Sequence, residues 1–147
     1  MGASDSRGFI YYLMKGGSVV YIGQSVSLEP RIAQHKRDKD FDSVRFIEVS
    51  GHISLNDAEF SQIITHKPTL NVTLPEVSYL VSSAYVSKKI AKESKIDGEV
   101  STGYNVSAPD VTIDLNGNKR NFWVNRNLKE YELIKYEIID CLNNLVK

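Results

Sequence analysis

The chain has 147 residues, of which 41% are hydrophobic and 24% charged, and these fractions are typical of a soluble globular protein with one domain, or one small domain with an elaboration. Lys and Arg together number 18, as do Asp and Glu, so the formal net charge is zero and a broad basic surface for nucleic acid is excluded. With Cys141 alone, no apolar run of about 18 residues and no secretory signal, the sequence predicts a cytoplasmic protein without internal disulfides and without membrane contact.

A β-hairpin is predicted near the start of the chain. Residues 9–14 and 19–22 are rich in β-branched and aromatic side chains, which favour strands. Gly16 and Gly17 lie between them and tolerate the positive φ angles of a tight turn. Residues 44–49 are predicted to add a third strand to this hairpin.

Two helices are predicted beside these strands. Ser27 is expected to cap a helix that runs to about residue 38, and Pro30 falls in its first turn, where a missing N–H costs no hydrogen bond. Ser54 is expected to cap a second helix that ends at about residue 66, shortly before Pro68. Residues 8–75 are therefore expected to form an α/β (α+β) core, a three-stranded antiparallel sheet flanked by helices.

The second half, residues 76–147, is expected to be an elaboration packed on that core, serving substrate specificity or oligomerisation. A helix is predicted over residues 78–95, and Asn116-Gly117-Asn118 predicts a hairpin between strands 111–115 and 121–124. Asn127 and Glu130 match a capping box at the start of a long amphipathic helix over residues 128–146. Its apolar stripe is too wide to remain in water, which predicts packing on the core or in a homodimer.

Six side chains that can ionise or hydrogen-bond come from the predicted hairpin and helices of the first half: Tyr11, Tyr21, Arg31, His35, Glu59 and Asn71. Each alone is more often a packing, solvent-facing or turn residue. The hairpin pairs the strands of the two tyrosines, and Arg31 and His35 share a helix face because they are four residues apart. Glu59 and Asn71 are separated by one helix and its exit, so all six groups can converge on one concave surface.

This order of groups, with the triplets Phe9-Ile10-Tyr11 and Tyr21-Ile22-Gly23 ten residues apart, resembles the GIY-YIG nuclease family over about residues 8–74. The run from Tyr21 to Ser25 is most similar to stand-alone bacterial and phage members. Phe9 stands where the family usually has Gly, and Gln24 replaces a residue that is often Lys. The resemblance implies a metal-dependent endonuclease that hydrolyses DNA phosphodiester bonds with one metal ion.

The resemblance also implies how the metal and the phosphate are held. Glu59 would bind Mg²⁺ or Mn²⁺ through oxygen, since a hard cation at a phosphate site is often held by one carboxylate and several waters. Arg31 would hold the scissile phosphate and offset its developing negative charge. Asn71 would orient either Glu59 or the backbone of the hairpin.

A tyrosine would take the proton of the attacking water, and we favour Tyr11 for this role, with Tyr21 positioning. Because the pKa of a free phenol is about 10, either nearby cations must lower it or His35 must accept the proton through the phenol.

The expected partner is DNA, with RNA left open. Contacts are expected from the end of the second strand and the end of the first helix, at Gly23, Gln24, Ser25, Lys36 and Arg37. Phe9 and the neutral net charge leave an alternative open, namely a catalytically weak or inactive nucleic-acid-binding or protein-interaction module on the same fold. A monomer and a homodimer are both compatible with the sequence.

Overall fold

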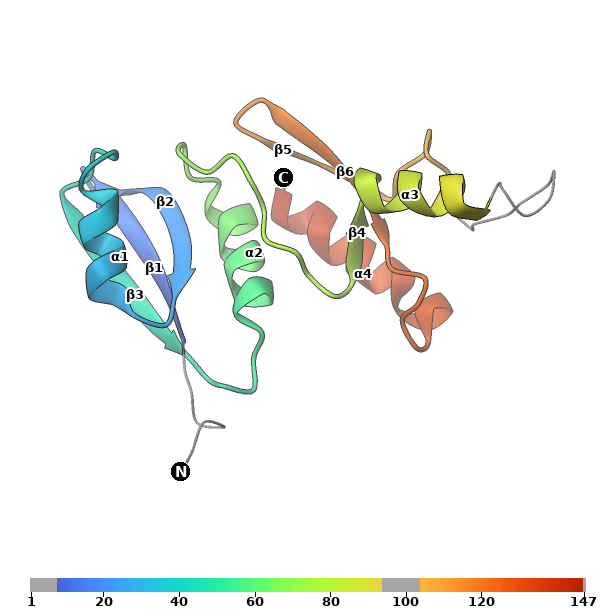
Figure 1. Ribbon diagram of the computed structural model, residues 1–147, viewed down its shortest axis with the longest axis horizontal. Coiled ribbons are helices and arrows are strands. Elements are labelled where there is room, and N and C mark those ends of the chain that lie inside the picture. The colour runs from blue at the N-terminus through green and yellow to red at the C-terminus, as the bar shows by residue number, and fades with distance from the viewer. Residues whose placement is uncertain (1–7, 94–103, 147) are drawn as a thin grey trace. The chain divides into compact units, whose positions relative to one another are not determined.

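The computed structural model describes residues 8–93 and 104–146. They belong to two compact units, of which the first ends at Pro75 and the second begins at Glu76 (Figure 1). The described residues form an α+β fold with two three-stranded antiparallel sheets, one in each unit, and four helices. No helix in this described part is long and apolar enough to cross a membrane.

The sheet of the first unit consists of β1 (Gly8–Lys15), β2 (Ser18–Ser25) and β3 (Ser43–Val49). The spatial order is β2-β1-β3, so β1 is central and both neighbours are antiparallel to it. Gly16 and Gly17 have φ angles of 58° and 82°, which L side chains rarely adopt, and they form the predicted tight turn. The three predicted strands are confirmed, although β2 continues three residues beyond its expected end.

The first helix, α1 (Leu28–His35), is shorter than predicted. Ser27 has the extended backbone of an N-cap, but its side chain makes no capping hydrogen bond. The helix ends at His35, whose carbonyl accepts hydrogen bonds from the backbone N–H groups of Asp38 and Lys39. Residues 36–40 are all charged, so a further helical turn would bury no apolar surface, and this accounts for the early end.

The second helix, α2 (Leu55–His66), begins and ends as predicted. The Ser54 hydroxyl accepts a hydrogen bond of 3.2 Å from the backbone N–H of Asp57, as expected of an N-cap. The buried side chains of the helix are Phe60, Ile63 and Ile64. The helix lies against β1 and β2 (Figure 1), and this packing fixes the positions of its partly buried polar residues relative to the hairpin.

The second unit contains, in chain order, β4 (Leu80–Ser82), α3 (Ser83–Glu93), β5 (Val111–Leu115), β6 (Asn118–Val124) and α4 (Tyr131–Val146). The strand order is β4-β6-β5, with β6 central.

Two predictions for this unit are wrong, and both concern the residue at which a helix begins. The helix expected from residue 78 begins only at Ser83, because residues 80–82 pair with β6 as an antiparallel strand, a contact that the local sequence does not encode. The capping box fails because Glu130 has a φ of 63°, which is incompatible with a position inside a right-handed helix. The helix therefore begins at Tyr131, and the Glu130 carbonyl accepts from the N–H groups of Leu133 and Ile134.

Candidate active site

The two predicted tyrosines project from the same face of the hairpin. Tyr11 is the Cα partner of Gly23, and Tyr21 is the partner of Leu13, so the tyrosines are diagonal neighbours across the two strands. Their ring centroids are 6.3 Å apart. Tyr11 is completely buried, whereas Tyr21 is half-buried, so Tyr21 is the more accessible of the two hydroxyl-bearing side chains.

Gly23 makes room for Tyr11. A Cβ atom at this position would lie 2.3 Å from the Tyr11 hydroxyl oxygen and 2.5 Å from the ring carbon that bears it. Both distances are far shorter than any real Cβ contact, so a side chain here would displace the phenol. Gly23 was predicted to contact DNA, and the structure reveals a second role, which is to let the phenol lie directly on the neighbouring strand.

His35 is the last residue of α1 and lies beside both tyrosines. Its Nε2 atom forms a buried hydrogen bond of 2.7 Å with the Tyr11 hydroxyl, and its ring centroid is 4.9 Å from that of Tyr21. Burial lowers the pKa of His35, and the nearby positive charges of Lys39 and Arg31 lower it further. His35 is therefore neutral at neutral pH and can accept a proton.

Both phenols are protonated at neutral pH. Burial raises the pKa of Tyr11 to about 12, against the opposing influence of a hydrogen bond and the charge from Arg31. Burial also raises the pKa of Tyr21, and the negative charge of Glu59 raises it further. Neither tyrosine is poised to act as a phenolate in the free protein, so a proton that reaches Tyr11 needs an onward acceptor, and His35 is hydrogen-bonded to it.

Glu59 lies half-buried on α2 and is held by the end of β2. The Gln24 side-chain amide donates hydrogen bonds of 2.7 Å to Oε1 of Glu59 and to Oδ1 of Asn56. Burial raises the pKa of Glu59, while the Gln24 hydrogen bond and the Arg31 charge lower it. Within the described residues Oε2 makes no hydrogen bond, so one oxygen of the carboxylate is fixed and the other is available to a ligand.

Asn71 is buried and binds the backbone of β2. Its Oδ1 accepts from the N–H of Ile22, and its Nδ2 donates to the carbonyl of the same residue, both at 2.9 Å. The backbone N–H of Leu70 also donates to the Val20 carbonyl at 2.8 Å. Of the two predicted roles for Asn71, the structure displays the one that orients the hairpin backbone.

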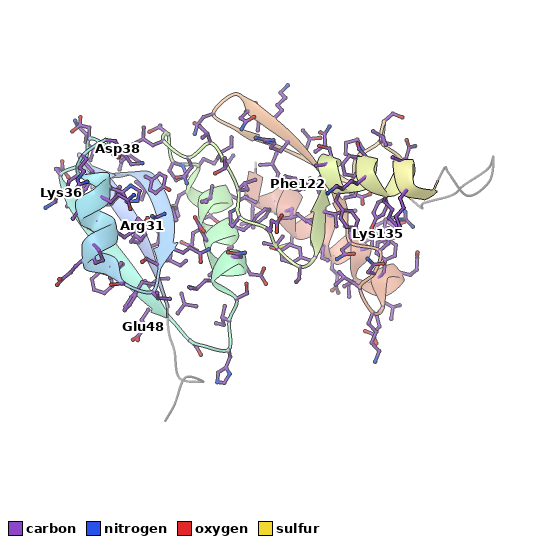
Figure 2. All side chains as sticks on the ribbon, viewed as in Figure 1. Arg31, Lys36, Asp38, Glu48, Phe122 and Lys135 are labelled. Carbon is purple, nitrogen blue, oxygen red and sulfur yellow. The ribbon has the colours of Figure 1, made fainter. Side chains whose placement is uncertain are left out.

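The predicted cationic residues lie on α1 and just beyond its end. Figure 2 shows Arg31 on the helix and Lys36 just beyond its last residue, and both side chains are exposed, as is that of Arg37. Arg31 donates a 3.1 Å hydrogen bond to Gln34 on its own helix. The influence of Arg31 on the pKa values of Tyr11, Tyr21, His35 and Glu59 places its charge beside the cluster.

Ser25, the third predicted contact at the end of β2, shapes a turn, because its hydroxyl donates to the Ser27 carbonyl and accepts from the Ser27 N–H. Its contact with DNA stays a prediction. Asn56 also belongs to the site, since it accepts a hydrogen bond from Gln24, but it was not identified from the sequence. It precedes Glu59 by three residues and so shares a helix face with it, and this spacing could have indicated its role.

The donor set fits a hard cation bound mainly through water. In the described part of the chain no three His, Cys, Asp or Glu side chains gather into a metal-binding group. The site offers the single carboxylate of Glu59, whose Oε2 accepts no hydrogen bond from residues 8–93 and 104–146. One carboxylate with several waters is an accepted arrangement for Mg²⁺ next to a phosphate, so the residues present are compatible with such an ion.

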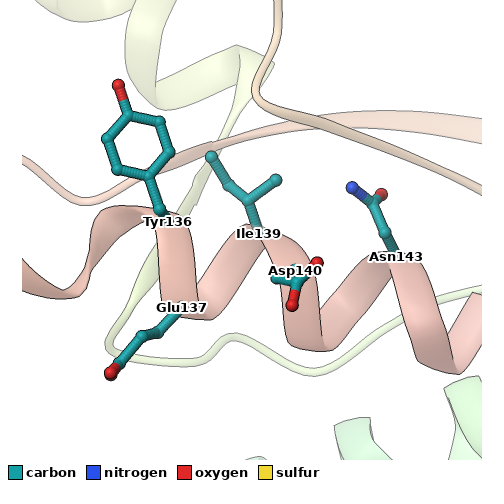
Figure 3. A pocket seen from close by; sticks show the side chains of 5 residues that line it. All are labelled: Tyr136, Glu137, Ile139, Asp140 and Asn143. Carbon is teal, nitrogen blue, oxygen red and sulfur yellow. The ribbon is translucent and has the colours of Figure 1, made fainter.

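A separate cavity of about 420 Å³ lies along α4 in the second unit (Figure 3). Side chains from this one helix line it: Tyr136, Glu137, Ile139, Asp140 and Asn143. It contains none of the predicted site residues.

A scan against protein-family models found no match to this chain, and searches of the curated proteins and of the solved structures found none either.

Proposed function

We propose that this chain is an endonuclease of the GIY-YIG type, which hydrolyses phosphodiester bonds of DNA with the help of Mg²⁺ or Mn²⁺. The observation that best supports the proposal is the buried hydrogen bond between Tyr11 and a neutral His35. The charges of Arg31 and Glu59 lie close enough to the same phenol to influence its pKa. A buried phenol needs one hydrogen-bond partner in any case, but a packing tyrosine does not need a cation and a carboxylate nearby as well. A proton-transfer site needs a donor, an acceptor and nearby groups that balance charge.

The proton of the attacking water is proposed to pass through Tyr11 to His35. As the water oxygen bonds to phosphorus and the bond from phosphorus to the 3′-oxygen breaks, the water proton moves to the Tyr11 oxygen while the phenol proton moves to Nε2 of His35. The leaving 3′-oxygen takes a proton from solvent. The net result is one proton transferred from water to imidazole, and the phenol returns to its neutral form. This route is consistent with the pKa of about 12 for Tyr11, which disfavours a free phenolate as the base. Tyr21 would position the water from the accessible side.

Charge on the phosphate is proposed to be balanced by two residues. Arg31 would donate hydrogen bonds to the non-bridging oxygens and offset the charge that develops on them. Glu59 would hold the metal through Oε2, with Gln24 fixing Oε1 and so the direction of the carboxylate. An ion held by Glu59 would supply Lewis-acid polarisation of the phosphate and of its leaving 3′-oxygen.

A second candidate is a nucleic-acid-binding or protein-interaction module of the same fold with little or no activity. The observation that favours it is the zero net charge, which limits the electrostatic affinity for DNA. In either case the second unit would contribute specificity or oligomerisation.

The test is cleavage of labelled single-stranded, duplex and branched DNA by the full chain with Mg²⁺, with Mn²⁺ and with EDTA. Glu59→Gln keeps the size of the side chain and removes its charge, and should reduce cleavage at least about 10²-fold. Asp57→Asn removes a charge from the same helix and should leave cleavage close to wild type. Cleavage that survives EDTA, or that the two variants reduce equally, would refute the metal assignment.

A further inference from the structure

The tyrosine-bearing face of the first sheet continues into a groove of about 510 Å³ beside the start of α1. We propose that this groove, here termed the stacking groove, binds an unpaired nucleobase next to the scissile phosphate. The substrate would then be single-stranded DNA or DNA with a displaced base. This inference rests on the proposed function and names its substrate class. Phe9, Glu29 and Phe46 are among its lining residues.

The strand register places the groove beside the candidate site. Phe46 on β3 is the Cα partner of Tyr11, so both side chains lie on the same face of adjacent strands. Phe9 precedes Tyr11 by two residues on β1 and also shares that face. Two residues of a strand span about 7 Å. A base in the groove would therefore belong to a nucleotide next to the phosphate held at Tyr11.

The two phenylalanines provide an aromatic surface suited to a planar base. Their ring centroids are 5.8 Å apart and the rings are nearly perpendicular, at 79°, so they are not stacked on each other. Phe46 is 57% exposed, which is unusually high for so large an apolar side chain in a sheet. The volume of the groove is within the range of about 300–1,000 Å³ found for small-ligand sites.

Charge favours a base over a phosphate in the groove. Glu29 lines it, and Glu48 is the Cα partner of Phe9 at the same end of the sheet. Carboxylates repel a phosphate but accept hydrogen bonds from the exocyclic amines of bases. The cationic residues follow in the chain, Arg31 on α1 and Lys36 and Arg37 just beyond its end, and the sugar–phosphate backbone would lie there.

The base must be unpaired because both faces of a base inside a duplex are already stacked on its neighbours. Binding between a phenylalanine ring and the α1 side of the groove requires the base to leave the stack or to come from a single strand. The groove therefore predicts a preference for single-stranded or branched DNA over perfect duplex.

The experiment is a titration of a short single-stranded oligonucleotide carrying one 2-aminopurine with the full chain in EDTA, so that cleavage does not interfere. The fluorescence of this base is quenched when it stacks. Phe46→Ala should weaken binding by about 10-fold, within the roughly 5–150-fold range for loss of one base-stacking aromatic, and should abolish the added quenching. Phe46→Tyr should retain both, because it keeps the ring and thus controls for misfolding.

Ile47→Ala is the matched control, since Ile47 is 48% exposed on the same strand but projects from the opposite face. It should bind like wild type. Equal affinity and quenching in Phe46→Ala and Ile47→Ala, tighter binding of perfect duplex, or absence of binding by the wild type would overturn the stacking groove. Cleavage assays are scored separately. Binding with quenching but no cleavage would support the stacking groove and refute the nuclease. Cleavage without quenching would support the nuclease and refute the stacking groove.

Discussion

The pH response of the candidate site depends on His35, which must be unprotonated to accept a proton from Tyr11. Burial lowers the pKa of His35 below its ordinary value, so the imidazole becomes protonated only in moderately acidic solution. We predict that kcat/KM falls as the pH decreases through this lowered pKa, below about 6.5, and is level above it.

The measurement is the pH–rate profile of the wild type and of His35→Ala at saturating metal. The variant should be slower by about 10²-fold or more on the level part of the profile and should lack the acidic limb. His52→Ala removes an exposed loop imidazole and serves as the control. An unchanged acidic limb in His35→Ala would mean that another group accepts the proton.

The ionised carboxylate of Glu59 is predicted to destabilise the folded state. Burial raises its pKa, so between its ordinary pKa and the raised value the folded state binds more protons than the unfolded state. Stability therefore decreases as the pH rises through this window, and the loss is complete above the raised pKa. Glu59→Gln should melt at a higher temperature than wild type at pH 7 in EDTA, and the difference should vanish in acid. A lower melting temperature at pH 7 would show that the ionised carboxylate stabilises the fold.

Gly23 is predicted to tolerate no side chain. In Gly23→Ala the new methyl group would meet the Tyr11 phenol at 2.3 Å, and relieving that contact should cost about 1–3 kcal/mol, as overpacking of cores does. The ring would move away from His35, so cleavage should fall along with stability. Chemical denaturation and cleavage assays check both, with Ser18→Ala at the exposed start of the same strand as the control variant that introduces no clash. Unchanged stability in Gly23→Ala would show that the strand moves easily.

At the level of elements, the start of α4 carries a strained residue. Glu130 has a left-handed backbone with a φ of 63°, a conformation that costs most L residues about 1–2 kcal/mol. We predict that Glu130→Gly stabilises the protein by about 1 kcal/mol in equilibrium unfolding. The capping-box interpretation predicts the opposite sign, because it would place Gly inside a helix. A Glu130→Gly variant that is less stable than wild type would therefore support the capping-box interpretation.

Sequence patterns predicted the elements whose signals are local. The turn at Gly16-Gly17 requires positive φ, and the cap at Ser54 requires one hydroxyl and one N–H three residues on, so both could be inferred from adjacent residues. The short strand β4 could not, because its pairing with β6 joins residues about forty positions apart. The early end of α1, in contrast, follows from the five consecutive charged residues 36–40, so its signal was present in the local sequence.

The candidate site shows the same division. The hairpin and the helix spacing were enough to bring Tyr11, Tyr21 and His35 together. The pairing of Gln24 with Glu59 was not foreseen, since it joins the end of β2 to the middle of α2. The protonation states could not be predicted from the sequence either. Burial of the phenol, which only the fold determines, has a larger effect on the pKa of Tyr11 than the nearby arginine.

At the level of the whole molecule, we predict that the two units unfold together. Each has its own sheet, yet Ile53 in the first unit and Leu133 and Tyr136 in the second are large apolar side chains with more than half of their surface exposed. Packing of the second unit on the first, or on a second copy, would cover such surfaces. Calorimetry of the full chain should then show one transition, and a fragment of residues 1–75 should be poorly soluble or unstable.

That fragment contains every residue of the proposed site, so its behaviour is informative in both directions. Two well-separated melting transitions, or a soluble and fully active fragment, would show that the second unit is an independent module. Sedimentation of the full chain across a range of concentrations would separate packing within one chain from packing between copies.

The pairing of Asn71 with Ile22 also has a consequence for the behaviour of the protein in concentrated solution. β2 is an edge strand of its sheet, and unpaired N–H and C=O groups on such a strand can recruit a strand from another molecule. Asn71 occupies both backbone groups of Ile22, and Leu70 occupies the carbonyl of Val20, so part of this edge is already used. The segment that orients the hairpin thus also protects the chain against aggregation, and loss of the Asn71 amide would expose a template for intermolecular β-pairing.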